Sequence, residues 1–149
     1  GVKAPQWQGL CRSVSEAAAA IGNETIRIHL PETDCEIYAD SLFGRAFYNL
    51  IENSIRHGGP VRNIVVDTET LPDGSLIIRY RDDGCGIPAG EKQKIFDQGY
   101  GKNTGFGLFF IREVLAITGR IIRETGTPGK GVVFEISVPK EAWRTGAGS

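Results

Sequence analysis

Residues 49–57 read Asn-Leu-Ile-Glu-Asn-Ser-Ile-Arg-His and carry two patterns at helical spacing. The apolar pattern extends upstream along one face, through Leu42, Phe43, Ala46, Phe47, Leu50, Ile51 and Ile55. The polar pattern is formed by Asn49, Glu52, Asn53 and Arg56, which are spaced i, i+3, i+4 and i+7 and therefore share the opposite face. Together the two patterns predict an amphipathic helix over about 42–55.

The polar face of this helix has two interpretations. A solvated surface is the plainer one. However, asparagine is a poor helix former, and two of them in mid-helix, at Asn49 and Asn53, lower the helix propensity without an obvious gain. A side-chain amide oxygen is a suitable hard ligand for Mg²⁺, and a nearby arginine such as Arg56 can hold phosphate oxygens. From the helix alone both interpretations stay open.

The sequence on either side predicts two more helices and a set of strands. Trp7, Leu10, Val14, Ala17, Ala18 and Ile21 recur at helical spacing, and Gly22 is placed to end that helix. A last helix is predicted over 105–118, and Asp40 or Ser41 can cap the central one. Strands are predicted over 25–30, 35–38, 63–70, 75–81, 120–124 and 131–138, with a hairpin at Pro72-Asp73-Gly74. This order indicates an α+β fold with helices on one sheet face rather than a Rossmann pattern.

Composition and charge exclude several classes of protein. The chain has 149 residues, 40% of them hydrophobic, so we expect a single domain over 1–149 with its core in about 7–139. Its 17 basic and 18 acidic residues give a net charge of −1, which favours neither nucleic acid nor an anionic membrane as partner. No run of about 18 apolar residues predicts a membrane span. Cys11, Cys35 and Cys85 form no metal-ligand pair and are typical of reduced, intracellular thiols.

Seven of the 20 glycines lie between Gly84 and Gly107, among apolar and charged residues. The first of them follow a predicted strand, in the segment Asp-Asp-Gly-Cys-Gly-Ile-Pro over 82–88. An ionised carboxylate only accepts hydrogen bonds, so Asp82 would suit the exocyclic amine of adenine. An ordinary acidic turn is the alternative. Adjacent residues of a strand point to opposite faces, which argues against a catalytic pair of Asp82 and Asp83.

Residues 99–108, Gly-Tyr-Gly-Lys-Asn-Thr-Gly-Phe-Gly-Leu, lead into the last predicted helix. Backbone N–H groups at a helix N-terminus attract anions, and Lys102 adds a positive charge. The segment is not a P-loop, because Gly-Lys-Ser/Thr is absent from the start of the helix. A plain flexible loop is the alternative, and it is less favoured because the segment ends in a helix cap.

The order of these motifs resembles the catalytic, ATP-binding domain of sensor histidine kinases. The matching segments are 49–57 for the N box, 82–88 for the G1 box, 95–96 for the F box, 104–108 for the G2 box and 129–139 for the strand that closes the fold. The chain is therefore similar to the superfamily that also includes gyrase, MutL and the heat-shock chaperone ATPases. The resemblance implies a two-layer α/β sandwich of the Bergerat type, with a mixed, mostly antiparallel sheet of about five strands and three helices on one face.

The same resemblance implies roles for individual residues. Asp82 would accept the adenine amine, Asn53 would bind Mg²⁺ with Asn49 as a second ligand or phosphate contact, and Arg56 and Lys102 would contact phosphates. The other ATP contacts that it implies are His57, Gly84, Gly86, Ile87, Ile95, Thr104, Gly105, Phe106, Gly107 and Leu108, with residues 97–104 as a short lid.

Departures from the family pattern bear on the chemistry. Ser54 stands where alanine is common, Phe106 where leucine is common, and Val132 where threonine or serine often makes a water-bridged adenine contact. Asn49 stands where hydrolytic members and the anti-sigma serine kinases carry a glutamate base. Because asparagine cannot take a proton, slow hydrolysis is expected. Glu52, one turn away, is an alternative base.

The phosphate acceptor is not expected in this chain. Its two histidines are His29, in a predicted strand, and His57, in the N box, and neither lies in the His-Glu/Asp-x-x-x-Pro context of an acceptor helix. The resemblance thus implies a protein-histidine kinase domain that uses MgATP, yields ADP, and needs a separate dimerisation and phosphoacceptor domain and a response regulator. We expect a cytoplasmic domain, monomeric by itself and without membrane contact, from a dimeric parent that is either membrane-anchored or cytosolic. A stand-alone ATPase switch and a non-catalytic nucleotide sensor are the alternatives.

Overall fold

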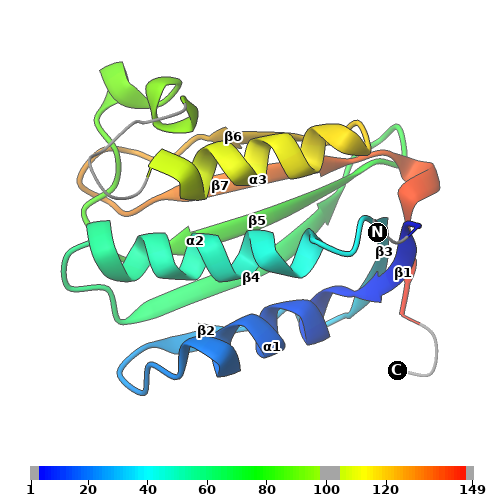
Figure 1. The fold of residues 1–149 in the computed structure, drawn as a ribbon, viewed down its shortest axis with the longest axis horizontal. Helices are drawn as coiled ribbons and strands as arrows, with labels where there is room; N and C mark the ends of the chain where they lie inside the picture. The colour runs from blue at the N-terminus through cyan, green and yellow to red at the C-terminus, as the bar shows by residue number, and fades with distance from the viewer. Residues whose placement is uncertain (1–3, 98–104, 147–149) are drawn as a thin grey trace.

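The computed structural model describes residues 4–97 and 105–146, which form two layers (Figure 1). Three helices, α1 (Leu10–Ile21), α2 (Phe43–His57) and α3 (Gly105–Ile117), lie side by side on one face of a five-stranded sheet. This arrangement confirms the predicted α+β sandwich. Within the described ranges, every helix is too short or too polar to span a bilayer.

The five strands are arranged in the order β2-β4-β5-β7-β6. Their bounds are β2 (Arg27–His29), β4 (Asn63–Thr70), β5 (Leu76–Asp82), β6 (Ile121–Glu124) and β7 (Val133–Val138). β2 runs parallel to β4 and the other neighbours are antiparallel, so the sheet is mixed, as predicted. β2 is shorter than the predicted strand over 25–30, because the N–H of Thr25 is held in a turn by Oδ1 of Asn23 at 2.8 Å.

The β4–β5 hairpin places Asp82 at the end of a central strand. The turn closes where the N–H of Leu71 donates to the carbonyl of Ser75 at 2.8 Å, and Gly74 adopts a φ of +88° that favours glycine. The register then pairs Asp82 with Ile64, near the start of β4. Alternate residues of β5 are buried beneath the helices, namely Leu76, Ile78, Tyr80 and Asp82.

A second, three-stranded sheet was not predicted. It consists of β1 (Gln6–Gly9), β3 (Cys35–Ala39) and β8 (Trp143–Thr145), in the order β1-β3-β8. The prediction that Trp7 belongs to the first helix is wrong, because Trp7 lies in β1, where its ring packs against Tyr38 with 5.3 Å between the ring centres and 57° between the planes. Arg144 lies on β8, which pairs with the other edge of β3, and its guanidinium is 4.0 Å from the centre of the Trp7 ring. The contacts with Tyr38 and Arg144 bury part of Trp7, whose spacing from the residues of α1 matched a helical pattern by chance.

The apolar face of α2 enters the core as the sequence predicts, except that the prediction for Leu42 is wrong, because it lies just before the helix and is 43% exposed. Its buried residues are Phe43, Ala46, Phe47, Leu50, Ile51 and Ser54. The helix begins at Phe43 without a side-chain cap, although Oδ1 of Asp40 accepts the N–H of Leu42 at 2.8 Å in the preceding turn. Gly22 ends α1 in the left-handed conformation, as predicted. Short 3₁₀ turns follow at Ala89–Glu91, Lys94–Phe96 and Lys140–Ala142.

Several chain segments meet at one end of the molecule. α2 ends, β5 ends and α3 begins at the left of Figure 1, whereas the small second sheet lies at the right. The segments that carry the predicted site are therefore gathered at the end opposite the small sheet.

Candidate functional site

The carboxylate of Asp82 is buried at the end of β5, and 7% of the residue is exposed. Its Oδ1 accepts the N–H groups of Gly84 and Val132, both at 3.0 Å. Its Oδ2 accepts the hydroxyl of Ser54 at 2.7 Å. An ionised carboxylate offers about four lone-pair positions, so these three hydrogen bonds leave one position on Oδ2. The group can therefore accept one more hydrogen bond from a ligand.

Two glycines allow the backbone to pack closely around Asp82. A Cβ on Gly84 would collide with the carbonyl oxygen of Gly58, and a Cβ on Gly131 would collide with that of Asp82. Gly131 also has a φ of +94°, where other residues are strained. The N–H of Cys85 donates to the Gly58 carbonyl at 2.9 Å. As a result, the turn after β5 rests directly on the end of α2.

Asp83 has different partners from Asp82. Its carboxylate accepts the N–H groups of Arg62 at 2.8 Å and Asn63 at 3.1 Å, and the Asn63 side-chain amide at 3.0 Å. Partial desolvation raises the pKa of Asp83, but the hydrogen bonds from Arg62 and Asn63 outweigh it, so the pKa is lowered overall. The two carboxylates thus have separate partners, as expected of neighbouring residues that point to opposite faces.

The polar face of α2 remains accessible. Asn49, Glu52 and Asn53 are half-buried and Arg56 is exposed, with 3.7 Å between Oε1 of Glu52 and Nη2 of Arg56. The side-chain amides of Asn49 and Asn53 form no hydrogen bond with any residue in 4–97 or 105–146. Their oxygens, one helical turn apart, are donors of the kind that Mg²⁺ prefers. The same ranges contain no cluster of three or more His, Cys, Asp or Glu side chains that could hold a metal.

The predicted phosphate-binding segment is described in part. Lys102 and Thr104 lie outside the described residues, as does most of the predicted lid over 97–104, of which Asp97 is described. α3 begins at Gly105, as the sequence predicts, and includes Phe106 and Gly107 in its first turn. The start of this helix lies at the same end of the molecule as the end of β5, where Asp82 is the last residue (Figure 1).

Other predicted contacts take part in packing. Ile95 and Leu108 belong to the buried core, and Ile87 packs against it. His57 is exposed at the end of α2, and its carbonyl oxygen lies 3.4 Å from Sγ of Cys85. Gly86 has a φ of +75° beside the 129–131 turn. Within the described residues, the structure thus brings His57 and the 84–86 turn together near Asp82, and places Ile95 and Leu108 beneath the surface.

Sequence reasoning missed two buried polar groups. The hydroxyl of Tyr80 lies 2.6 Å from Oγ of Ser54, and both residues are buried. Lys92 forms an ion pair with Glu124, whose other oxygen accepts the N–H groups of Gly126 at 3.1 Å and Val133 at 2.9 Å. Tyr80 could have been found from its place two residues before Asp82, which puts both on the same sheet face. No local signal marks the partner of Glu124.

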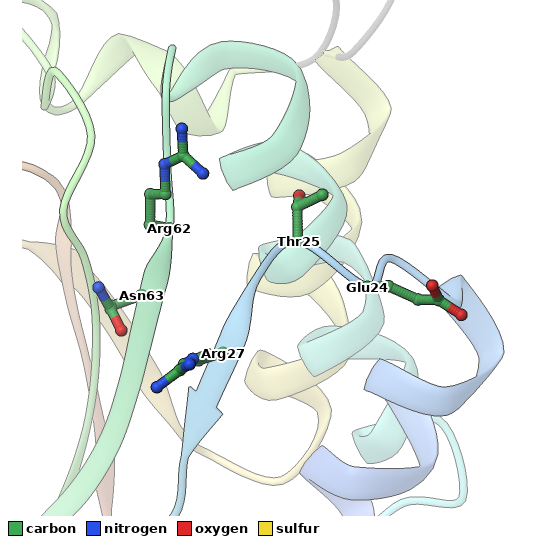
Figure 2. Close-up of a pocket in the computed structure, with 5 residues that line it drawn as sticks. All are labelled: Glu24, Thr25, Arg27, Arg62 and Asn63. Carbon is green, nitrogen blue, oxygen red and sulfur yellow. The ribbon is translucent and has the colours of Figure 1, made fainter.

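A polar hollow of about 430 Å³ adjoins the turn that carries Asp83. Figure 2 shows its lining residues, Glu24, Thr25, Arg27, Arg62 and Asn63, which come from β2, the turn before it and the start of β4. The guanidinium groups of Arg27 and Arg62 form no ion pair with residues that the structure describes. None of the predicted site residues lines this hollow, so it is separate from the surroundings of Asp82.

Comparison with known proteins decides the family. A sequence profile of the family described as "Histidine kinase-, DNA gyrase B-, and HSP90-like ATPase" matches residues 39–142. The chain belongs to this family. The match includes the ends of α2 and β5 and the whole of α3, which are the segments gathered around Asp82.

Relatives of the chain are named as sensor proteins and histidine-protein kinases. The chain is 30% identical over 124 residues to the sensor protein KdpD of Escherichia coli, covering 78% of this chain and 14% of KdpD. It is 34% identical over 102 residues to the signal transduction histidine-protein kinase AfsQ2 of Streptomyces coelicolor, covering 62% of this chain and 18% of AfsQ2. The chain therefore spans less than a fifth of the length of these two relatives.

Solved structures share the fold. The mycobacterial sensor histidine kinase MprB matches with a TM-score of 0.77 at 19% identity, covering 91% of this chain and 97% of the other. ShkA matches with a TM-score of 0.76 at 15% identity, covering 96% of this chain and 32% of the other. These likenesses confirm the two-layer sandwich fold.

Proposed function

We propose that this chain binds MgATP and donates the γ-phosphate to a histidine on a separate dimerisation and phosphoacceptor domain. It would be the catalytic half of a two-component sensor kinase, would release ADP, and would lead to phosphorylation of a response regulator. Membership of the ATPase family supports ATP binding, and the relatives named as sensor kinases support the kinase assignment. ShkA, which shares the fold, was solved in complex with AMPPNP.

The remaining acceptor position on Oδ2 of Asp82 carries the adenine assignment. Adenine offers an exocyclic amine that can donate to this oxygen, whereas guanine presents a carbonyl at the equivalent ring position, which would face another acceptor. Gly58 borders the same oxygen, since a Cβ there would lie 3.4 Å from Oδ2. We therefore assign Asp82 to the adenine amine, with Gly84 and Gly86 giving the base access.

The free amides on α2 support a phosphate and metal site beside the base. Asn53 would bind Mg²⁺ with Asn49, and Arg56 would contact phosphate oxygens. Mg²⁺, when bound, would neutralise negative charge on the phosphates. Backbone N–H groups at the start of α3 would contribute the positive end of a helix dipole. The remaining contacts that we propose are His57, Ile87, Ile95, Lys102, Thr104, Gly105, Phe106, Gly107 and Leu108.

Transfer to histidine explains why Asn49 needs no proton-accepting side chain. A neutral imidazole already has a free electron pair on one ring nitrogen. That pair forms the new P–N bond while the bond between the γ-phosphorus and the bridging oxygen breaks and ADP leaves with the electrons. Glu52 would act through Arg56, which lies beside it, by holding the guanidinium near the phosphates. Catalysis would then consist of positioning and charge stabilisation.

A titration with MgATP tests this function. We expect the wild-type chain to bind, Asp82→Asn to lose most of its affinity, and Asn53→Asp to have a weakened Mg²⁺-dependent affinity. Asp83→Asn is the matched control, because its carboxylate faces other partners, and it should bind as the wild type does. Unchanged binding in Asp82→Asn would falsify the site assignment.

A transfer assay then separates the kinase from its alternatives. We expect the chain with MgATP to label a supplied acceptor-helix domain and to hydrolyse ATP slowly by itself. Rapid steady-state hydrolysis without an acceptor would instead identify a stand-alone ATPase. Nucleotide binding without transfer to any supplied acceptor domain would identify a non-catalytic sensor.

A further inference from the structure

Ser54 is a buried serine on α2 whose hydroxyl donates to a partner outside that helix. Serine in a helix commonly donates to the carbonyl four residues earlier, which here is Leu50. Instead, the Ser54 hydroxyl donates to Oδ2 of Asp82 at 2.7 Å. Ser54 is 2% exposed, so its hydroxyl cannot donate to solvent water as a surface serine would.

The position of Tyr80 explains why the Ser54 hydroxyl does not donate to the Leu50 carbonyl. Its ring is fully buried and packs on Phe134, with 6.2 Å between the ring centres. Its hydroxyl oxygen lies 3.0 Å from the Leu50 carbonyl and 2.6 Å from Oγ of Ser54. The tyrosine therefore occupies the space beside the carbonyl to which the serine would otherwise donate. Burial raises the pKa of Tyr80, so its hydroxyl keeps its proton.

The number of protons available and the charge on Asp82 decide where the Ser54 hydroxyl donates. Three short contacts, from Leu50 to Tyr80, from Tyr80 to Ser54 and from Ser54 to Asp82, share two hydroxyl protons. A charged acceptor forms the stronger hydrogen bond, so the Ser54 proton goes to the carboxylate. This occupies one lone pair of Oδ2 and leaves the other as the acceptor position that a ligand can use.

We propose that Ser54 and Tyr80 are positioning residues that hold the Asp82 carboxylate for the adenine amine and so determine base specificity. This inference rests on the proposed function. In the described structure Val132 meets Asp82 through backbone groups, with its N–H donating to Oδ1 at 3.0 Å and its carbonyl accepting the Asp82 N–H at 3.2 Å, so Ser54 on α2 supplies the side-chain hydroxyl. The pair acts on recognition of the amine and not on the phosphates.

The test compares two ligands that differ only in that amine: MgATP and the magnesium complex of purine riboside triphosphate. For the wild-type chain we expect ATP to bind at least about tenfold more tightly, as is typical of a hydrogen bond to a charged group. In Ser54→Ala the advantage of ATP should fall to about threefold or less, while the affinity for purine riboside triphosphate stays within about twofold of wild type. Tyr80→Phe should reduce the advantage in the same direction.

The ratio of the two ligand affinities within each variant separates loss of base recognition from a general disturbance of the structure. Ser13→Ala is the control, because Ser13 is also a buried helical serine, but its hydroxyl donates at 2.8 Å to the carbonyl of Gly9, just before α1. This variant should keep the wild-type ratio. An unchanged ratio in both Ser54→Ala and Tyr80→Phe, or an equal loss for both ligands, overturns the inference while leaving the ATP site standing. Absence of ATP binding by the wild-type chain overturns the proposed function as well.

Discussion

Lys92 and Glu124 form an ion pair in which the Glu124 side chain is completely buried and the Lys92 side chain is about one-fifth exposed. Lys92 belongs to the segment that follows the Asp82 turn, and Glu124 ends the edge strand β6. The second carboxylate oxygen accepts two backbone N–H groups, from Gly126 and Val133. The pair thus joins the 89–96 segment to the turn between β6 and β7.

Glu124→Gln should destabilise the domain. Removing one partner of a buried pair typically costs about 3–5 kcal/mol, and we expect the lower end because Lys92 keeps contact with water. Thermal or urea unfolding measures the loss. Glu16→Gln is the control, since the Arg12–Glu16 pair on α1 is exposed, and it should change stability by less than about 0.5 kcal/mol. Equal stability of the two variants would contradict the structural role of Glu124.

Gly84→Ala should disturb both stability and nucleotide binding. The added Cβ would collide with the Gly58 carbonyl, and overpacking of this kind costs about 1–3 kcal/mol. The turn after β5 would shift with Asp82, so ATP affinity should fall together with the melting temperature. Gly90→Ala is the matched control, because nothing lies within 4 Å of a Cβ there. If Gly84→Ala matched this control in both measurements, the close approach of backbone at position 84 would be ruled out.

Glu52→Gln separates pairing from proton transfer. If Glu52 acts through Arg56, the neutral and similarly shaped glutamine should lower the transfer rate to a supplied acceptor domain by less than about tenfold, because exposed ion pairs contribute little. A general base would be worth about 10²–10⁴-fold. Single-turnover transfer with saturating MgATP gives the rate, and a loss in the larger range would assign the base to Glu52.

The thiols should differ in reactivity towards alkylating reagents. Burial, reinforced by the Asp34 carboxylate, raises the pKa of Cys11 to about 12 and that of Cys35 to about 11. A raised pKa means less thiolate at a given pH, so both should react slowly at pH 8 and faster as the pH approaches those values. Cys85 is exposed and should be labelled first by iodoacetamide, as read by mass spectrometry. Labelling in urea is the control, and a folded Cys35 that reacts as fast as Cys85 would contradict the prediction.

The periodic spacing of apolar residues along the sequence was the basis of most of the fold prediction. The 3.6-residue spacing of α2 and the alternation along β4 and β5 reflect contacts that each element makes with one core, so the sequence reveals them. The spacing of Trp7 misled because a four-residue strand is too short to show its own period against a helix that follows directly. The small sheet depends on pairing between segments that are far apart in the sequence, and such pairing produces no pattern within any one segment.

The candidate site was predictable in its outline and not in its internal bonds. Asp82 and the polar face of α2 follow from residue type and position. The partnership of Ser54 with Tyr80 joins residues 26 positions apart, and that of Lys92 with Glu124 joins residues 32 positions apart. Such pairs arise from the packing of one element on another, so the sequence showed Ser54 simply as a departure from a family pattern.

The small sheet has a consequence for how the chain is made. β3 pairs with β1 on one side and with β8 on the other, and a hydrogen bond of 2.6 Å joins Glu36 to Arg144 across 108 positions. During synthesis on the ribosome, β1 and β3 can meet early, but β3 keeps an unpaired edge until residues 143–145 emerge. An open strand edge invites pairing with other chains, and contacts between distant positions form slowly. In the nascent protein the edge of β3 therefore stays open to misassociation, at the end of the molecule opposite Asp82, until these three residues dock on it.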